Sequence, residues 1–163
     1  MKEILHDLEI TPGVSVATQL RSALFYRDPR AALAWLESAF GFELSMLLED
    51  ADGGIAHSQM KLGDGLIMVG TEWTALHQSP ASLDGRNTQT ISILIDEDID
   101  AHCERARKAG AVIAAEPETQ FYGDRTYRCH DPEGHIWNVS QTVKAVSREE
   151  AEAATGLKIT GWM

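Results

Sequence analysis

Basic residues are scarce in this chain. Of its 163 residues, 14 are Lys or Arg and 25 are Asp or Glu, so the formal net charge is −11 at pH 7. This charge repels phosphate backbones and anionic membrane surfaces, and no cluster of Lys and Arg offsets it locally. The composition therefore argues against a nucleic-acid partner and is compatible with a neutral or cationic small molecule.

Long hydrophobic runs are also missing. No apolar stretch approaches the roughly 20 residues that a membrane-spanning helix needs. The opening segment MKEILHDLEITPG carries acidic residues and has neither the hydrophobic region nor the small-residue cleavage site of a secretory signal. We therefore expect a cytoplasmic protein with no membrane partner.

Cysteine is equally rare, and the two that occur, Cys103 and Cys129, have no CxxC spacing. We expect both to be buried, reduced thiols without a chemical role. The chain also lacks a GxSxG motif, so nothing in it indicates nucleophilic catalysis.

Two segments have the signals of helices. In DPRAALAWLESAFG, Asp28 supplies a side-chain acceptor at the N-cap and Gly41 ends the helix. In DIDAHCERARKAG, the helix begins at Asp98 or Asp100 and ends at Gly110.

These helices belong to an internal repeat. Each is preceded by one strand-like segment and followed by another and then by a hairpin, whose turns are GDG and DPEG. Gly41 and Gly110, which end the helices, are as far apart as Gly65 and Gly134 in the hairpin turns. The sequence thus predicts an α+β fold with two tandem βαβββ units, which form curled mixed sheets around a central cavity.

The repeat divides the chain into segments. We expect an N-terminal extension at 1–16, a domain at 17–142 with units at 17–72 and 88–142, and a C-terminal helix and tail at 143–163. The linker between the units is rich in Ser, Pro, Gly and Asn. In the last segment, Ser147 and Glu150 have the spacing of a capping box.

The repeated unit, with YRDPRAALAWLESAFGFEL in its first copy and DPEGHIWNVS closing its second, resembles the vicinal oxygen chelate superfamily. This superfamily includes glyoxalase I, extradiol dioxygenases and bleomycin-resistance proteins. The resemblance implies a cavity that holds either a divalent metal or a ligand, on a scaffold that serves many chemistries. It also implies a homodimer, with the cavity formed either within one chain or between two.

The metal-binding relatives place ligands early in the first strand and in the last strand of each unit. The matching positions here are Arg21, then Thr90 or Ile91, then Asn138, with Val69 as its first-unit equivalent. The relatives use imidazole, amide or carboxylate side chains at these places, and here none of the positions carries a good ligand, so we predict no metal site and no cofactor.

Strand alternation selects the side chains that face the cavity. A polar set that includes Thr90, Lys61 and His130 lies on one face, with Phe121 near the rim. From this set we predict a ligand-binding group: Arg21, Phe25, His57, Gln59, Trp73, Ser92, Tyr122, Thr126, Arg128 and Asn138. His135, Trp137 and Val139 are assigned to the opposite, core side, whereas His6, His77 and His102 are predicted to lie at the surface.

The leading hypothesis is a metal-independent protein that binds, and sequesters, an aromatic or antibiotic-like compound with an anionic group that buried arginines recognise. The alternative is a lyase, isomerase or dioxygenase of the same superfamily with an atypical or absent metal site. His57 and Glu72 are its candidates for a proton-transfer base. A third possibility is a domain whose pocket is filled by its own side chains.

Overall fold

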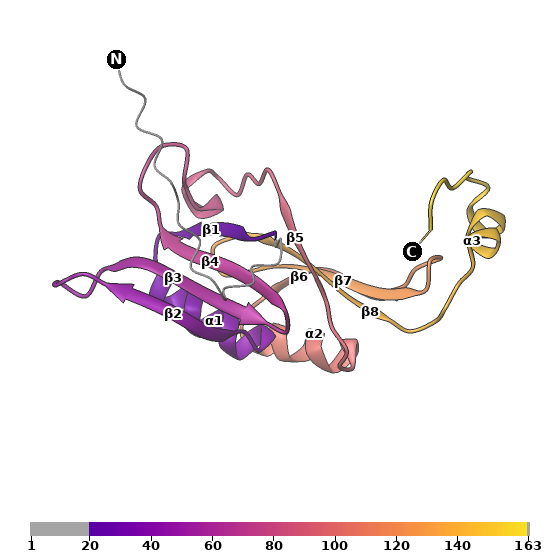
Figure 1. The fold of residues 1–163 in the computed structure, drawn as a ribbon, viewed down its shortest axis with the longest axis horizontal. Helices are drawn as coiled ribbons and strands as arrows, with labels where there is room; N and C mark the ends of the chain where they lie inside the picture. Colours follow the sequence, from indigo (N-terminus) through magenta and orange to yellow (C-terminus); the bar gives the residue numbers. More distant parts are fainter. Residues whose placement is uncertain (1–19, 163) are drawn as a thin grey trace, which may run out of the picture.

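The computed structural model describes residues 20–162, and the predicted extension at 1–16 lies outside this range. The first unit comprises β1 (Ser22–Tyr26), α1 (Pro29–Phe40), β2 (Glu43–Glu49), β3 (Ile55–Leu62) and β4 (Gly65–Thr71). The second comprises β5 (Thr90–Leu94), α2 (Ile99–Lys108), β6 (Val112–Thr119), β7 (Asp124–His130) and β8 (Ile136–Thr142). A 3₁₀ turn (Pro80–Ser82) lies in the linker, and α3 (Arg148–Thr155) follows the second unit (Figure 1).

Each unit forms its own four-stranded sheet. The strand orders are β1-β4-β3-β2 and β5-β8-β7-β6, which are the same order repeated. The strands that come first and last along the chain of each unit, β1 with β4 and β5 with β8, pair in parallel. The remaining pairs are antiparallel. The predicted α+β fold with tandem βαβββ units is confirmed, but the two curled sheets do not close into a barrel.

The helix ends follow from local chemistry. The Asp28 side chain accepts a hydrogen bond of 2.9 Å from the Ala31 N–H, and Gly41 ends α1 in the left-handed conformation at φ 78°. Asp98 caps α2 through a 2.7 Å bond from Ala101 N–H. Both predicted caps are therefore present, with Asp98 rather than Asp100 opening the second helix.

The core is shared between the two units. Helices α1 and α2 pack against each other on one side of the sheets (Figure 1). A single hydrophobic cluster joins residues of both halves, including Phe40 from α1 and the fully buried Trp137 from β8. The rings of these two residues meet edge to face at a centroid distance of 5.0 Å. As predicted, His135, Trp137 and Val139 lie on the core side, and both cysteines are free and buried.

Two acidic side chains of the second hairpin tie the units together. The buried Asp131 accepts hydrogen bonds from the Tyr26 hydroxyl at 2.7 Å and the Trp137 indole at 3.2 Å. Glu133 accepts from the backbone N–H groups of Arg27 and Asp28, at 2.8 and 2.9 Å, and from the Ser79 hydroxyl. A carboxylate from the second unit thus holds the two residues that lead into α1, including its N-cap Asp28.

The prediction that His102 lies at the surface is wrong. The side chain is fully buried, stacks on Phe40 at 5.5 Å and shares a 2.7 Å hydrogen bond with the Tyr127 hydroxyl. Its position, three residues after Ile99 and four before Ala106, places it on the apolar face of α2. Burial, with a smaller effect from the Arg105 charge, lowers the pKa of His102 to about 4.

The predicted equivalence of Val69 with Asn138 is also wrong. Asn138 lies across from Arg128 on the face of its sheet that is turned away from the helices, called the open face below. Val69, by contrast, is buried beneath the helices. The residue in the matching position of the first sheet is Met68, which pairs with Gln59. The second hairpin turn is longer by one residue, and this shifts the register of the last strand.

The described residues contain no helix with the length and apolar character needed to cross a bilayer.

Candidate functional site

The open face of the first sheet carries the most developed group of candidate residues. A cavity of about 460 Å³ lies over this face and is lined in part by Phe25, His57, Met68 and Trp73. Its residues come from β1, β3 and β4, with Trp73 from the start of the linker. Three of the predicted ligand-binding residues, Phe25, His57 and Trp73, therefore meet in one place.

Aromatic rings form one wall of this cavity. The ring of Phe25 meets His77 edge to face at a centroid distance of 5.0 Å, and the Trp73 ring lies 4.6 Å from the same imidazole with the planes tilted by 30°. His77 is half-buried rather than a surface residue as predicted. Trp73 is 68 % exposed, so most of its ring is available to a planar ligand.

Polar groups are fixed within the same cavity and beside it. The Gln59 amide nitrogen lies 3.0 Å from Nε2 of His57, and the Thr74 hydroxyl lies 2.7 Å from Nδ1 of His77. Both imidazoles are therefore held by neighbouring side chains. Gly70 faces Phe25, and a Cβ at this position would lie 3.6 Å from the phenyl ring, in ordinary van der Waals contact.

The open face of the second sheet holds another part of the predicted set. Ser92, Asn138 and Arg128 are successive partners across β5, β8 and β7, so their side chains share one face. Thr126, two residues before Arg128 in β7, lies on the same face. This row lies outside the cavity lined by Phe25 and Trp73.

Arg128 differs from the other arginines of this sheet and its helix. Arg105 and Arg125 form ion pairs with Glu97 and Asp100, at 2.8 Å in both cases. The Arg128 side chain has neither a hydrogen bond nor an ion pair with any residue that the structure describes. It is also exposed, so the prediction of buried arginines is wrong for this residue and for Arg21.

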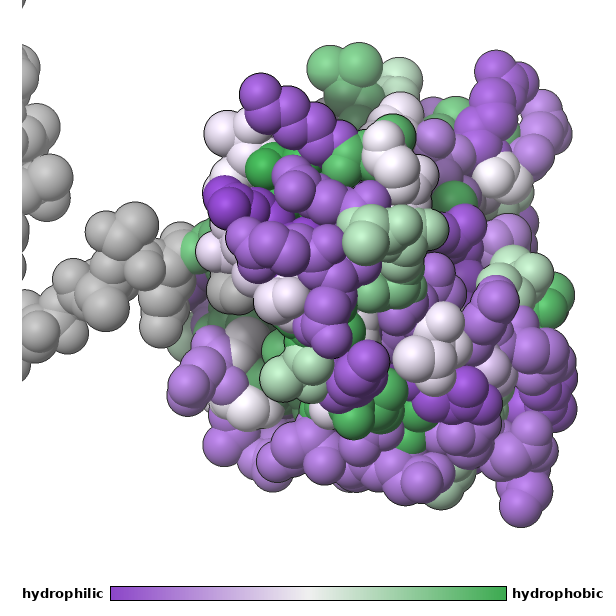
Figure 2. Space-filling model, turned by 90° about the vertical axis from the view of Figure 1, so that its right-hand side faces the viewer, coloured by the Kyte–Doolittle hydropathy of each residue, from purple (hydrophilic) through white to green (hydrophobic). Residues whose placement is uncertain are grey.

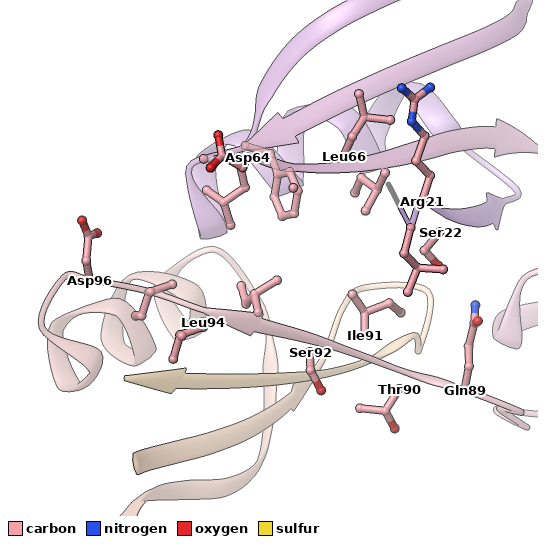
Figure 3. Close-up of a pocket in the computed structure, with 18 of the residues that line it drawn as sticks. Arg21, Ser22, Asp64, Leu66, Gln89, Thr90, Ile91, Ser92, Leu94 and Asp96 are labelled. Carbon is pink, nitrogen blue, oxygen red and sulfur yellow. The ribbon is translucent and has the colours of Figure 1, made fainter. Parts of the chain in front are cut away.

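Arg21 lies at the junction of the two sheets. It lines a cavity of about 920 Å³ between the start of β1, the β3–β4 turn and β5. Figure 3 shows that Ile91 points into the gap between the sheets, whereas Thr90 and Ser92 point away from the first sheet. Arg21 and Ser92 therefore border the same cavity without directing their polar groups to one point.

Two further predicted residues lie elsewhere. Tyr122 lines a separate cavity at the C-terminal end of the domain. Glu72 accepts a 2.6 Å hydrogen bond from Ser79 N–H and so holds the linker. The structure distributes the predicted site over two sheet faces, their junction and the C-terminal end.

The strand pairing identifies the residues at the four positions where the metal-binding relatives place their ligands. They are Arg21, Met68, Thr90 and Asn138, and none is a histidine or a carboxylate. Within residues 20–162, no group of three or more His, Cys, Asp or Glu side chains is arranged to hold a metal ion. The side chains present do not fit a divalent cation at the position used by the metal-binding relatives.

Sequence reasoning missed His77 and Met68 as site residues. The signal for His77 was its place four residues after Trp73 in the linker, but irregular segments give no periodicity from which to infer a contact. Met68 was missed because the second hairpin turn is longer by one residue, so that counting from the hairpin glycines matched Asn138 with Val69 instead.

Comparisons with known proteins agree with this architecture. A profile of the Glyoxalase/Bleomycin resistance protein/Dioxygenase superfamily matches residues 18–139. An uncharacterised protein of Mycobacterium tuberculosis is 28 % identical over 148 residues, which cover 88 % of this chain and 86 % of that protein.

Solved structures show the same fold. TioX from Micromonospora sp. ML1 is 30 % identical with a TM-score of 0.63, and the match covers 78 % of this chain and all of TioX. The fosfomycin resistance protein FosX from Mesorhizobium loti is 16 % identical with a TM-score of 0.55, over 78 % of this chain and 93 % of that protein. With the repeated βαβββ units and the profile match over most of its length, this chain belongs to the glyoxalase/bleomycin resistance protein/dioxygenase superfamily.

Proposed function

We propose that this chain is a metal-independent small-molecule-binding protein of the glyoxalase/bleomycin-resistance type, which sequesters a planar aromatic compound with an anionic group. The observation that carries the proposal is the cluster of Phe25, His77 and Trp73 rings beside the His57–Gln59 pair. An exposed aromatic ring next to a few fixed polar groups is the usual composition of a small-molecule site.

The anionic group of the ligand is inferred from Arg128. Unlike Arg105 and Arg125, it has no carboxylate partner among the described residues and is exposed, so its guanidinium is accessible to an anion. Its neighbours across the strands, Asn138 and Ser92, add neutral hydrogen-bonding groups. A carboxylate or phosphate would complete this row by a charge-assisted hydrogen bond.

The two sheet faces come together if a second copy is present. Leu44, Met46 and Leu48 of the edge strand β2 are 43–52 % exposed, and the last two pair with Gln59 and His57. On the second sheet, Leu94 and Val112 are 66 % and 63 % exposed. We infer a two-fold homodimer in which the first sheet of one chain covers the second sheet of the other, because this buries apolar surface on both and closes the cavity.

The enzymatic alternative, a lyase, isomerase or dioxygenase, has less support. Of its two candidate bases, His57 has Nε2 at hydrogen-bonding distance from Gln59, and Glu72 is bonded to the linker backbone. A proton-transfer base needs a free lone pair directed at the substrate. The contacts of both residues favour a positioning role.

The test uses 2-naphthoate as the probe and 2-naphthamide as its uncharged analogue, with binding followed by tryptophan fluorescence. We expect Trp73→Ala to weaken both probes about tenfold through loss of aromatic contact. Arg128→Gln weakens naphthoate about tenfold or more and leaves naphthamide unchanged. The matched control is Arg125→Gln, which removes an already paired arginine from the same strand. Equal naphthoate affinity in the Arg128 and Arg125 variants, or no saturable binding, would refute the proposal.

A further inference from the structure

A third cavity lies at the C-terminal end of the domain, beside the last strand pair of the second sheet. It measures about 680 Å³ and is bordered by the turn at 121–122, the end of β8 with residues 142–146, and the tail at 159–162. In Figure 1 this part of the chain, with α3, stands at the right-hand end of the molecule. It shares no lining residue with the cavity over the first sheet.

Three aromatic rings from different segments converge here. Phe121 and Tyr122 lie edge to face, with centroids 5.1 Å apart and planes at 90°. Trp162 reaches the cavity from the tail, where its indole N–H donates a 2.9 Å hydrogen bond to the Val146 carbonyl. The three side chains are 40–46 % exposed, so each presents ring surface to the cavity.

The backbone around these rings is held in place. The Gly123 carbonyl accepts from the N–H groups of both Val143 and Lys144 at 3.0 Å. Gly123 is buried at φ 99°, and a Cβ there would collide with the Lys144 carbonyl. On the tail, Ile159 N–H donates to the Glu152 carboxylate at 2.7 Å. Such fixed geometry lowers the entropy cost of binding.

The core of the domain does not account for this arrangement. Ala151 is the buried residue of α3, so the helix adds little to the hydrophobic interior. Residues beyond 139 also lie outside the match to the superfamily profile. The extension thus adds Trp162 to a cavity that Phe121 and Tyr122 of the β6–β7 turn also line, rather than to the core. At this end of the molecule the surface is hydrophilic with small hydrophobic patches (Figure 2).

The charges at the rim balance one another. Lys144 contributes one ammonium group, and Asp124 contributes one carboxylate that accepts from the Thr142 hydroxyl at 2.8 Å. A wall of aromatic and aliphatic groups with one charge of each sign does not select a net-charged ligand.

We propose that this cavity is a second small-molecule site, which binds a neutral, planar aromatic compound. Its volume lies within the range of ligand-binding pockets, about 300–1,000 Å³. The inference is independent of the function proposed for the sheet faces, because it uses none of the same residues.

The experiment titrates N-phenyl-1-naphthylamine, an uncharged fluorescent probe, into the full-length protein. We expect saturable binding that Tyr122→Ala weakens about tenfold. The matched control is Leu76→Ala, at a linker residue that is 90 % exposed and does not line this cavity, and it changes the affinity less than about twofold. No saturable binding, or an equal effect of the two substitutions, would overturn the proposal.

A second measurement does not depend on the folding of the Tyr122 variant. The indole N–H resonance of Trp162 in the unmodified protein is assigned with Trp162→Phe and followed by NMR during the titration. It should shift with the probe, whereas the resonances of the buried Trp35 and Trp137 stay in place. A shift confined to Trp73 would place the probe at the first sheet, and a Trp162 shift that follows protein concentration alone would show that a second copy fills the cavity. Either result contradicts the proposal.

Discussion

The Tyr26 hydroxyl donates a 2.7 Å hydrogen bond to Asp131, 105 residues further along the chain, and both side chains are at most 2 % exposed. Burial first, and then the Asp131 charge, raises the pKa of Tyr26 well above its usual value. This bond joins the first strand of one unit to the hairpin of the other within the common core.

Replacing this hydroxyl tests how strongly the two units are coupled. In Tyr26→Phe, Asp131 keeps the hydrogen bonds from the Trp137 indole and from the backbone N–H groups of Glu133 and His135. It loses the shorter of its two side-chain hydrogen bonds. We expect the free energy of unfolding to fall by about 1–3 kcal/mol in urea denaturation. The control is Tyr122→Phe at an exposed position. Equal stability of the two variants would mean that the bond contributes nothing.

The buried His102 predicts a particular dependence of stability on pH. Its pKa is about 4 in the folded protein and about 6.5 in the unfolded chain, so between these values the unfolded chain binds more protons. The contribution of neutral His102 to the free energy of unfolding is therefore fully present above pH 6.5 and is lost as the pH falls towards 4. From pH 7 to pH 5 we expect a loss of about 2 kcal/mol.

The His102 contribution is measured as a difference. Urea denaturation of the wild type and His102→Asn at pH 7 and pH 5 should show a smaller acid-dependent loss in the variant, because asparagine does not titrate. Parallel losses would assign the acid sensitivity to carboxylates instead.

Gly123 offers a test of backbone proximity. In Gly123→Ala the new methyl group meets the Lys144 carbonyl, whereas in Gly53→Ala, at φ 80°, it meets nothing within 4 Å. Both substitutions strain a left-handed residue, but only the first also forces two backbone segments apart. We expect Gly123→Ala to lower the free energy of unfolding by at least about 1 kcal/mol more than Gly53→Ala does. Equal losses would show that the turn at 121–123 moves freely from residues 143–144.

Metal ions should leave the protein unchanged. The side chains at the inherited ligand positions are arginine, methionine, threonine and asparagine, which do not form a site for a divalent cation. We expect EDTA, Ni²⁺, Zn²⁺ and Fe²⁺ to shift the Tm by less than about 1 °C. Stoichiometric metal in protein purified without chelators, detected by mass spectrometry, would contradict this.

The proposed dimer depends on the exposed edge of the first sheet. Leu48, which is 52 % exposed and pairs with His57, becomes charged in Leu48→Glu. Sedimentation velocity should then show a dimer for the wild type and a monomer for the variant, because a carboxylate is costly to bury. Leu76→Glu, at a linker residue 90 % exposed, should remain dimeric. A monomeric wild type would disprove the dimer.

The fold could be predicted from the sequence because its signals are local. Asp28 and Gly41 mark the ends of a helix through backbone chemistry that needs no distant partner, and the repeated order of elements follows from alternation and turns. The burial of His102 was also within reach, since its spacing from Ile99 and Ala106 is that of a helix face.

The site was less predictable because it depends on register and on loop contacts. The second hairpin turn is longer by one residue, so the first-sheet equivalent of Asn138 is Met68 and not Val69. Because side chains alternate along a strand, Met68 is on the open face and Val69 is on the core face. The contact of His77 with Phe25 joins an irregular linker to a strand, and no sequence pattern specifies it. Whether Arg128 has a carboxylate partner depends on which side chains its sheet brings near, which the linear order does not reveal.

Glu133 makes the first repeated unit depend on the second. Because its carboxylate accepts from the N–H groups of Arg27 and Asp28, helix α1 relies on the other half of the chain for hydrogen bonds at its start. A polypeptide cut in the linker would therefore give two fragments that are each incompletely folded alone but complement one another when mixed. We therefore expect the two repeated units to unfold together, in one cooperative transition.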